Sequence, residues 1–449
     1  MAKTDFSQGS IKRLIISQAL PLTLAQAVQL LYNVVDRVYI GHLEGIGDLA
    51  LTGLGITFPV IVLINAFTSL YGSGGATLFA IARGQRDERE AEAILGNVFA
   101  LLVSTALVLM AFCYGLRRPI LFLFGASEQS FFYADQYLGI YLLGTVCSMT
   151  TAGLNSYINA QGFPQVGMLT TILGAVMNII LDPIFIFAMN MGVRGAALAT
   201  ILSQAVSALW VLRFLTGRKA ILKLRRANIR VRWSRTRKIL ALGIPGFVMQ
   251  GTNSLVAIMC NNQLQAYGGD LYVGIMTVVS SVREMLSLPT SGIAQGGQAV
   301  MGFNYGAKEY DRVKETIRFI TILGFAATFV GWVLVMAFPG QLMGIFSDDP
   351  ETIRIGARML NIQFFGFVFM SFQFGGQCTF QALGRAKQAV FFAIFRKAII
   401  VVPLTLLLPA VGLGVEGVFM AEPVSNFVGG VTCFTTMYLT LYRKLGKKA

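Results

Sequence analysis

Charged residues are scarce in this chain. Of its 449 residues, 13% are Asp, Glu, Lys or Arg, whereas about 25% is usual in a soluble domain. Hydrophobic residues make up 55%, and the mean hydropathy is +0.67. This balance excludes an ordinary soluble domain and predicts that most of the chain lies in a membrane.

Histidine and paired cysteines are also lacking. The single histidine is His42, and all five cysteines lie inside apolar runs with no His or second Cys at metal-ligand spacing. The sequence therefore predicts no disulfide framework, no metal site and no cofactor. Because the apolar runs hold no metal cluster and no nucleophile–base pair, an integral-membrane enzyme is the least favoured interpretation.

Apolar runs long enough to cross a ~30 Å hydrocarbon core as helices recur along the whole chain. Strands of a membrane barrel alternate apolar and polar residues, whereas these runs are continuously apolar. The first has no cleavage site after a short apolar region, so it is a span and not a removable signal. We predict an all-α integral membrane protein with twelve spans, at residues 14–40, 50–81, 94–116, 131–160, 164–188, 194–216, 237–265, 270–303, 315–338, 355–382, 388–410 and 415–442.

The chain repeats itself at a shift of 222 residues. Along this register glycines fall on glycines: Gly74 on Gly296, Gly144 on Gly366, and residues 192–195 (GVRG) on 414–417 (GVEG). One constant offset across separate patches predicts two copies of a six-helix unit. We therefore divide the chain into an N-terminal lobe (1–216), a basic inter-lobe linker (217–236) and a C-terminal lobe (237–449).

The net charge of +15 is unevenly placed. Alternate loops and both ends hold 27 of the 36 Lys and Arg, and residues 213–238 alone hold eleven with no acid. The opposite loops hold few basic residues beside several acids, Glu44 among them. This positive-inside pattern predicts that both termini and the 213–238 loop are cytoplasmic. It also argues against nucleic acid as a partner.

Several polar side chains inside the spans share a helix face. The first span carries polar residues at spacings of three and four, which puts them on one face: Gln26, Gln29, Asn33 and Asp36. Asn178 and Asp182 lie one turn apart on the fifth span, and Pro183 weakens the helix just beyond. Charged groups at membrane depth usually face a cavity or a partner, so Asp36 and Asp182 are candidate functional acids.

The second copy mirrors the polar faces but not these acids. The mirrored cavity candidates are amides: Asn155 and Asn159 in the first copy, and Gln250, Asn253, Gln373 and Gln377 in the second. The buried acid of the second copy is Glu422, which stands opposite Thr200. Arg283 and its neighbour Glu284 are charge partner candidates, with Glu422 a possible partner of Arg283. Arg396 and Lys397 are expected to extend toward the cytoplasmic surface.

Three segments carry recognisable motifs: residues 31–41 (LYNVVDRVYIG), residues 177–187 (MNIILDPIFIF) and, shortly after the latter, residues 192–200 (GVRGAALAT). The first is similar to the first-helix signature of the multidrug and toxic compound extrusion (MATE) family of transporters. The second resembles the fifth-helix motif of that family, and the third follows it as it does in the family. The resemblance covers nearly the whole chain and is greatest to the bacterial branch that contains staphylococcal-type multidrug exporters.

The resemblance implies a twelve-helix exporter of a bacterial plasma membrane, whose two lobes form a V and alternate between outward- and inward-facing states. Family members expel organic cations in exchange for Na⁺ or H⁺. Their lobe-one cluster for the coupling ion matches Asp36, Asn178, Asp182 and Thr200, and Pro21 matches a proline at which the first helix bends. We expect a monomer surrounded by membrane lipid, whose partners are small cationic amphipathic drugs or metabolites.

Two functions remain open from the sequence. The favoured one is an antiporter that takes up H⁺ in preference to Na⁺, because two carboxylates close together in a poorly solvated pocket do not both stay charged cheaply. The alternative is a flippase for lipid-linked sugars from the same broad superfamily. A flippase would line its cavity with several basic side chains for phosphate, and the candidates here are Arg37, Arg283, Arg396 and Lys397.

The charge distribution leads to a test of topology. In a background whose native cysteines are replaced, Arg225→Cys should resist an impermeant thiol reagent added outside intact cells, because its loop faces the cytoplasm. Asp348→Cys, in an opposite loop, is the accessible control. Labelling of position 225 from outside at the rate of position 348 would overturn the topology.

Overall fold

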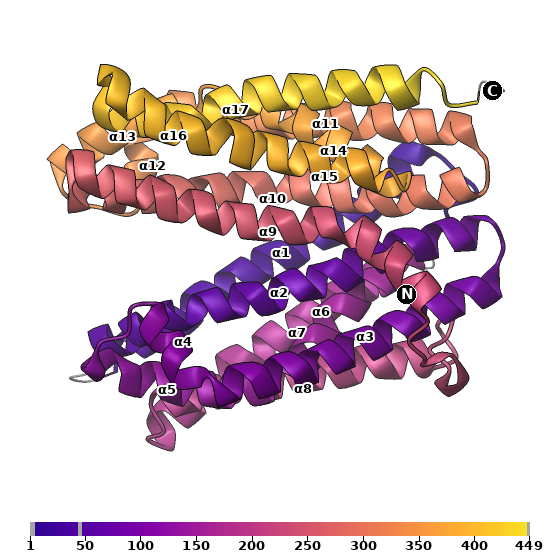
Figure 1. The fold of residues 1–449 in the computed structure, drawn as a ribbon, viewed down its shortest axis with the longest axis horizontal. Helices are drawn as coiled ribbons and strands as arrows, with labels where there is room; N and C mark the ends of the chain where they lie inside the picture. The colour runs from indigo at the N-terminus through magenta and orange to yellow at the C-terminus, as the bar shows by residue number, and fades with distance from the viewer. Residues whose placement is uncertain (1–4, 44–46, 447–449) are drawn as a thin grey trace. The chain divides into compact units, whose positions relative to one another are not determined.

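The structure, a computed structural model, describes residues 5–43 and 47–446, so Glu44 and both ends of the chain lie outside the described residues. The described residues form helices joined by short connections and no strands (Figure 1). They group by packing into two units. Of the described residues, unit 1 comprises residue 5 and residues 24–247, and unit 2 comprises residues 6–23 together with residues 248–446.

Unit 1 contains seven whole helices and parts of α1 (Ile11–Gly41) and α9 (Trp233–Gly268). The whole helices are α2 (Gly47–Gly84), α3 (Glu88–Gly115), α4 (Arg117–Leu123), α5 (Glu128–Leu143), α6 (Thr145–Ala160), α7 (Pro164–Pro183) and α8 (Val193–Thr216). α5 and α6 form one span bent by 57°. A π-helical segment, Ile184–Ala188, follows Pro183, as expected where proline removes a helix hydrogen bond.

Unit 2 contains the remaining helices. They are α10 (Asp270–Gly306), α11 (Tyr310–Ala337), α12 (Pro339–Gly344), α13 (Pro350–Phe364), α14 (Met370–Ala382), α15 (Ala386–Ile394), α16 (Val402–Leu408) and α17 (Gly414–Met437). α13 and α14 form a span bent by 40°. Between α15 and α16 the chain continues as a π-helical segment, Phe395–Val401. Such segments are often found at functional sites.

The predicted all-α membrane fold with twelve spans is confirmed. Among the described residues, nine helical stretches are long and apolar enough to cross a membrane, and the two bent pairs bring the number to 11. One of the nine, Ala386–Tyr442, is 57 residues long and is broken at Gly412 and Gly414, where φ is +100° and +52°. Divided at this break, it supplies the last two predicted spans.

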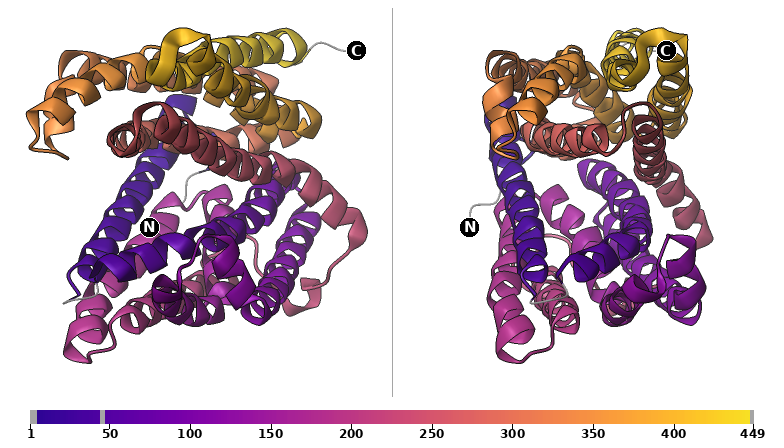
Figure 2. Two further views of the ribbon diagram at one scale, coloured as in Figure 1. Left: turned by 60° about the vertical axis from the view of Figure 1, so that its left-hand side comes forward. Right: turned by 90° about the vertical axis from the view of Figure 1, so that its left-hand side faces the viewer.

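The two units repeat one pattern of helix packing. In unit 1, α2 packs on α3 and α6, and α8 packs on α5, α6 and α7. In unit 2, α10 packs on α11 and α14, and α17 packs on α13, α14 and α16. The turned views in Figure 2 show each unit as its own bundle of helices. The duplication read from the sequence is therefore a duplication of tertiary packing.

Two long helices are each divided between the units. Residues 11–23 of α1 pack in unit 2 and the rest of α1 in unit 1, whereas residues 233–247 of α9 pack in unit 1 and the rest in unit 2. Pro21 and Pro245 each lie two residues before the division in their helix. The lobe boundaries predicted at residues 216 and 237 follow the sequence repeat. The packing units differ from the predicted lobes at these two helix ends: the start of α1 belongs to unit 2, and the start of α9 belongs to unit 1.

The predicted linker, residues 217–236, is packed against unit 1. The side-chain oxygen of Gln161 accepts hydrogen bonds from the backbone N–H groups of Ile221 and Leu222, at 2.9 and 3.0 Å. Arg225 forms an ion pair with Glu92 of α3, with 2.8 Å between Nε and Oε2. These contacts hold the basic segment at one end of the unit 1 helices.

Gly243 tests how closely α9 approaches α2 within unit 1. A Cβ at Gly243 would collide with the backbone of Leu70, whereas Gly251 of the same helix has no neighbour within 4 Å. We expect Gly243→Ala to lower the free energy of unfolding by about 1–3 kcal/mol, because backbone atoms have no rotamer by which to make room. Gly251→Ala is the matched control and should have no such effect. Thermal unfolding in detergent measures the stability of both variants. Equal unfolding temperatures for Gly243→Ala and Gly251→Ala would contradict the close approach of α9 to α2.

Candidate functional site

Unit 1 gathers the four predicted ion-coupling residues from three helices. We call them the carboxylate cluster: Asp36 on α1, Asn178 and Asp182 on α7, and Thr200 on α8. All four are buried, with Asp182 0% exposed and Asp36 9% exposed. Asp36 lies in the part of α1 that packs in unit 1, so the whole cluster belongs to one unit.

The side chains of the carboxylate cluster contact one another. Asn178 donates a hydrogen bond from Nδ2 to Oδ1 of Asp182, at 3.2 Å, as its position one helical turn earlier predicts. The carboxyl groups of Asp36 and Asp182 also lie close enough to act on each other electrostatically. Neither acid forms an ion pair with a described basic residue. The two acids therefore meet in an apolar bundle without an ion-pair partner among the described residues, and the exposed Arg37 acts on Asp36 only electrostatically.

Three oxygen atoms of this cluster are buried and have no hydrogen-bond partner. They are Oδ1 of Asp36, Oδ1 of Asn178 and Oδ2 of Asp182. A buried oxygen without a partner is costly, so oxygens gathered in this way fit a proton or a small cation. This donor set suits either H⁺ or Na⁺ by its chemistry, since Na⁺ takes oxygen ligands and a carboxylate takes a proton.

Tyr137 of α5 belongs to the same site and was missed by the sequence analysis. It is 4% exposed, and its hydroxyl lies near the side chain of Thr200. Its ring stacks on Tyr141 with 5.9 Å between centroids. Tyrosines at positions 133, 137 and 141 share a helix face at a spacing of four, and this spacing is the signal that would have located Tyr137.

One pair of mirrored amides makes the same helix-packing bond in both units. Asn155 donates from Nδ2 to the backbone oxygen of Gly167, at 3.2 Å, and Gln377 donates from Nε2 to that of Ala389, at 2.8 Å. Donor and acceptor are both related by the shift of 222, so one bond is present twice. Asn159 is half-buried in unit 1, as are Gln26 and Gln29, whereas Asn33 is exposed. In unit 2, Gln250 and Asn253 are exposed and Gln373 is buried.

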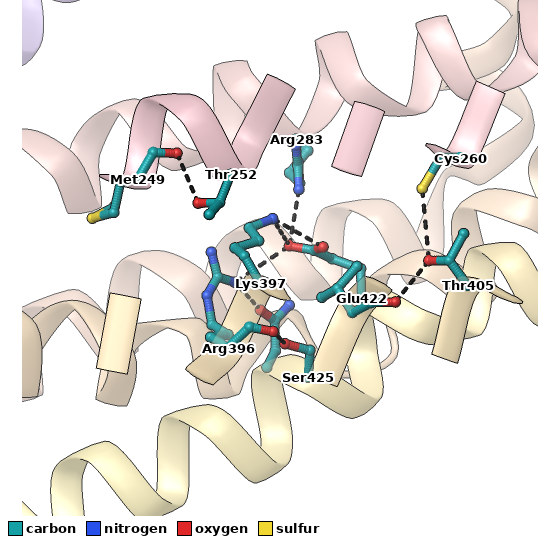
Figure 3. Close-up of polar contacts among 11 residues, drawn as sticks. Met249, Thr252, Cys260, Arg283, Arg396, Lys397, Thr405, Glu422 and Ser425 are labelled. Carbon is teal, nitrogen blue, oxygen red and sulfur yellow. Dashed lines mark hydrogen bonds and ion pairs between the residues drawn. The ribbon is translucent and has the colours of Figure 1, made fainter. Parts of the chain in front are cut away.

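Unit 2 holds a different charged arrangement around Glu422 of α17 (Figure 3). Lys397 donates from Nζ to both carboxylate oxygens, at 2.8 and 3.0 Å. Arg283 of α10 and Arg396 each place Nη1 near Oε1, at 3.0 and 3.3 Å. We call these four residues the Glu422 cluster. It combines one buried acid with three cations.

This cluster corrects one expectation from the sequence. Arg396 and Lys397 do not extend toward the cytoplasmic surface, because both turn to Glu422 and Lys397 is 4% exposed. The π-helical segment that carries them changes the angular position of its side chains, so regular helical spacing does not predict their direction. Glu284, next to Arg283, is exposed and is not a member of the cluster.

Comparison with known proteins agrees with this architecture. The profile of the MatE family matches the chain twice, at residues 21–184 and 245–407, once in each copy of the repeat. The multidrug export protein MepA of Staphylococcus haemolyticus is 23% identical over 427 residues, which cover 94% of this chain and 93% of that protein. The probable multidrug resistance protein YpnP of Bacillus subtilis is 23% identical over 437 residues, covering 95% and 96%.

The fold is shared with solved structures. One is described as the outward-facing conformation of a multidrug resistance MATE family transporter; it matches with a TM-score of 0.93 and 23% identity over 100% of both chains. The protein is thus a multi-pass integral membrane protein of the transporter class and not an enzyme. It belongs to the MATE family, and the bacterial relatives confirm the branch that the sequence motifs indicated.

The charge balance of the Glu422 cluster predicts unequal effects of mutation. Glu422→Gln leaves three cations without their carboxylate and should lower the free energy of unfolding by about 3–5 kcal/mol. Lys397→Met should destabilise the protein less than Glu422→Gln, because Glu422 still forms ion pairs with Arg283 and Arg396. Glu416→Gln, which removes an exposed ion pair with Arg358, is the control, with an expected effect of about 0–1 kcal/mol. Thermal unfolding measures all three, and equal losses for Glu422→Gln and Glu416→Gln would contradict the assigned balance.

Proposed function

We propose that this protein exports small amphipathic organic cations from a bacterial cell in exchange for H⁺. The proposal places it in the plasma membrane as a monomer, with both termini and the 213–238 loop in the cytoplasm. The names of its relatives, a multidrug export protein and a probable multidrug resistance protein, support the export of drugs. The carboxylate cluster supports cations as the exported class, because an anionic buried site attracts them.

One observation carries the coupling: two buried acids, Asp36 and Asp182, lie close together and form no ion pair with a described basic residue. Two ionised carboxylates that face each other in an apolar bundle repel each other, so a proton on one of them is favoured. The cluster therefore holds a proton in one state and releases it in another.

Exchange follows if a proton and an organic cation neutralise the same negative charge. With a drug bound, the positive group of the drug balances the ionised carboxylate. When a proton arrives from outside, that charge is removed and the attraction for the drug falls. Pro21 lies two residues before the point at which α1 changes unit, so a bend there would move residues 24–41, which carry Asp36. The bend itself is carried over from the family resemblance.

Asp182→Asn tests the site. The amide is nearly isosteric with the carboxylate, so we expect normal expression and folding while drug export falls to the level of vesicles without the protein. Asp36→Asn should behave alike, whereas Asp311→Asn, an exposed acid at the start of α11, should export normally. Fluorescent organic cation uptake into everted vesicles is the measurement. Wild-type transport by well-folded Asp182→Asn protein would remove the cluster from the mechanism.

The coupling ion is tested in the same vesicles with the gradients imposed separately. A proton gradient alone should drive uptake of the organic cation at a constant Na⁺ concentration, and its collapse by a protonophore should stop uptake. Na⁺ gradients at clamped pH should have little effect. Dose-dependent stimulation by Na⁺ with no response to the pH gradient would reverse the assignment, and the unpartnered oxygens would then be Na⁺ ligands.

A further inference from the structure

The Glu422 cluster carries more positive charge than its acid balances. Lys397 is 4% exposed and the side chain of Arg396 is 13% exposed, while Glu422 is 6% exposed. Even if water screens Arg283, whose side chain is 35% exposed, two buried cations face one buried anion. Among the described residues no other carboxylate forms an ion pair with these cations. A buried charge without a partner is unfavourable, so the surplus is relieved either by loss of the Lys397 proton or by a bound anion.

A cavity lies beside the surplus charge. It has a volume of about 30 Å³ and is enclosed by α9, α14, α15 and the π-helical segment that follows, all within unit 2. Its polar lining consists of Asn253, Gln373, Gln377, Arg396 and Lys397. Space for one water needs roughly 10–15 Å³, so this cavity admits a water-sized to carboxylate-sized group and excludes a whole drug molecule.

Arg396 has donors left for a ligand in this cavity. Its Nη1 donates to Oε1 of Glu422 and to Oδ1 of Asn426, at 3.3 and 2.8 Å (Figure 3 shows the side chain beside Glu422). A guanidinium has five N–H donors, and no described residue accepts from Nη2 or Nε. Ser425 donates to the backbone oxygen of Arg396, at 3.0 Å, which holds this residue in place. A fixed guanidinium with free donors suits a carboxylate or halide.

The amide side chains of Gln373 and Gln377 have hydrogen-bonding groups that a bound anion and a water molecule in the cavity would satisfy. The side-chain oxygens of Gln373 and Gln377 are buried without a partner. Gln377 is fixed by its bond to Ala389, so its oxygen remains an acceptor toward the cavity, whereas a half-turn of the Gln373 amide presents its NH₂ group as a further donor. An anion at Arg396 together with a water at Gln377 would satisfy these groups.

We propose that unit 2 binds a singly charged anion, a halide or the carboxylate group of a larger molecule, in the cavity at Arg396 beside the Lys397–Glu422 pair. The site goes beyond the proposed cation exchange and does not involve the carboxylate cluster. It would neutralise the cationic surplus of unit 2. The anion and Glu422 compete for Arg396. Removal of the Arg396 charge should therefore lower the anion affinity, and removal of the Glu422 charge should raise it.

The test is thermal unfolding of the purified full-length protein in sodium chloride, sodium acetate and sodium isethionate, at constant Na⁺, ionic strength and pH. Wild-type protein should show a saturable rise in its unfolding temperature with chloride or acetate relative to isethionate, whose bulky sulfonate does not fit the cavity. A response to acetate alone identifies the carboxylate source, and a response to chloride alone identifies the halide. The same curve in all three salts would overturn the proposal.

Two variants with opposite expectations sharpen this test. Arg396→Gln should weaken the apparent anion affinity on the order of tenfold, because a charged hydrogen-bond donor is lost. Glu422→Gln should strengthen it by a similar factor, because the competing carboxylate is removed. Arg358→Gln, at an exposed ion pair of α13, is the matched control and should respond like wild type. A change in the same direction for Arg396→Gln and Glu422→Gln would reject the site.

Two further arms keep the result unambiguous. If Arg396→Gln does not fold, the comparison of wild type with Glu422→Gln still decides, since only a genuine site becomes tighter when its acid is neutralised. Asp182→Asn should retain the wild-type anion response, because its change lies in unit 1. An anion response that disappears in Asp182→Asn would assign the effect to the carboxylate cluster and contradict the site in unit 2.

Discussion

A charge inside an apolar helix bundle has to be neutralised within a few ångströms, and both units are organised around this constraint. In unit 2 the buried negative charge of Glu422 is neutralised by side chains of the same unit, Lys397 and two arginines. In unit 1 Asp36 and Asp182 form no ion pair with a described basic residue. The negative charge of unit 2 is therefore neutralised within the fold, and under the proposed function that of unit 1 is neutralised from solution.

The duplicated scaffold separates packing from chemistry. The hydrogen bond from Asn155 to Gly167 recurs as the hydrogen bond from Gln377 to Ala389. The repeat therefore preserves the contact between α6 and α7 of unit 1 as the contact between α14 and α15 of unit 2. At Thr200 and its counterpart Glu422 the repeat preserves the backbone position and changes the group presented. Helix contacts therefore set the fold, and a few substitutions at equivalent positions set the charge that each unit holds at its centre.

How much the sequence predicts depends on whether an interaction is local. The twelve spans followed from apolar length, and the Asn178–Asp182 bond followed from one turn of a regular helix. Arg396 and Lys397 were predicted wrongly, because a π-helical segment alters their direction and their partner lies on another helix. Tyr137 was missed for the second reason: its contact with Thr200 joins two spans, and the tyrosine spacing shows a shared face without showing what that face meets.

The same charge argument decides which unit is suited to couple transport to a proton. A proton added to Glu422 would leave three cations without a counter-charge and increase the buried positive charge of unit 2. A proton added to the Asp36–Asp182 pair reduces the buried negative charge of unit 1, so uptake and release there are both accessible. Under the proposed function, a drug cation bound at that pair would reduce the negative charge as a proton does. Competition between drug and proton would then be favoured in unit 1 and opposed in unit 2, which is the asymmetry that the proposed exchange requires.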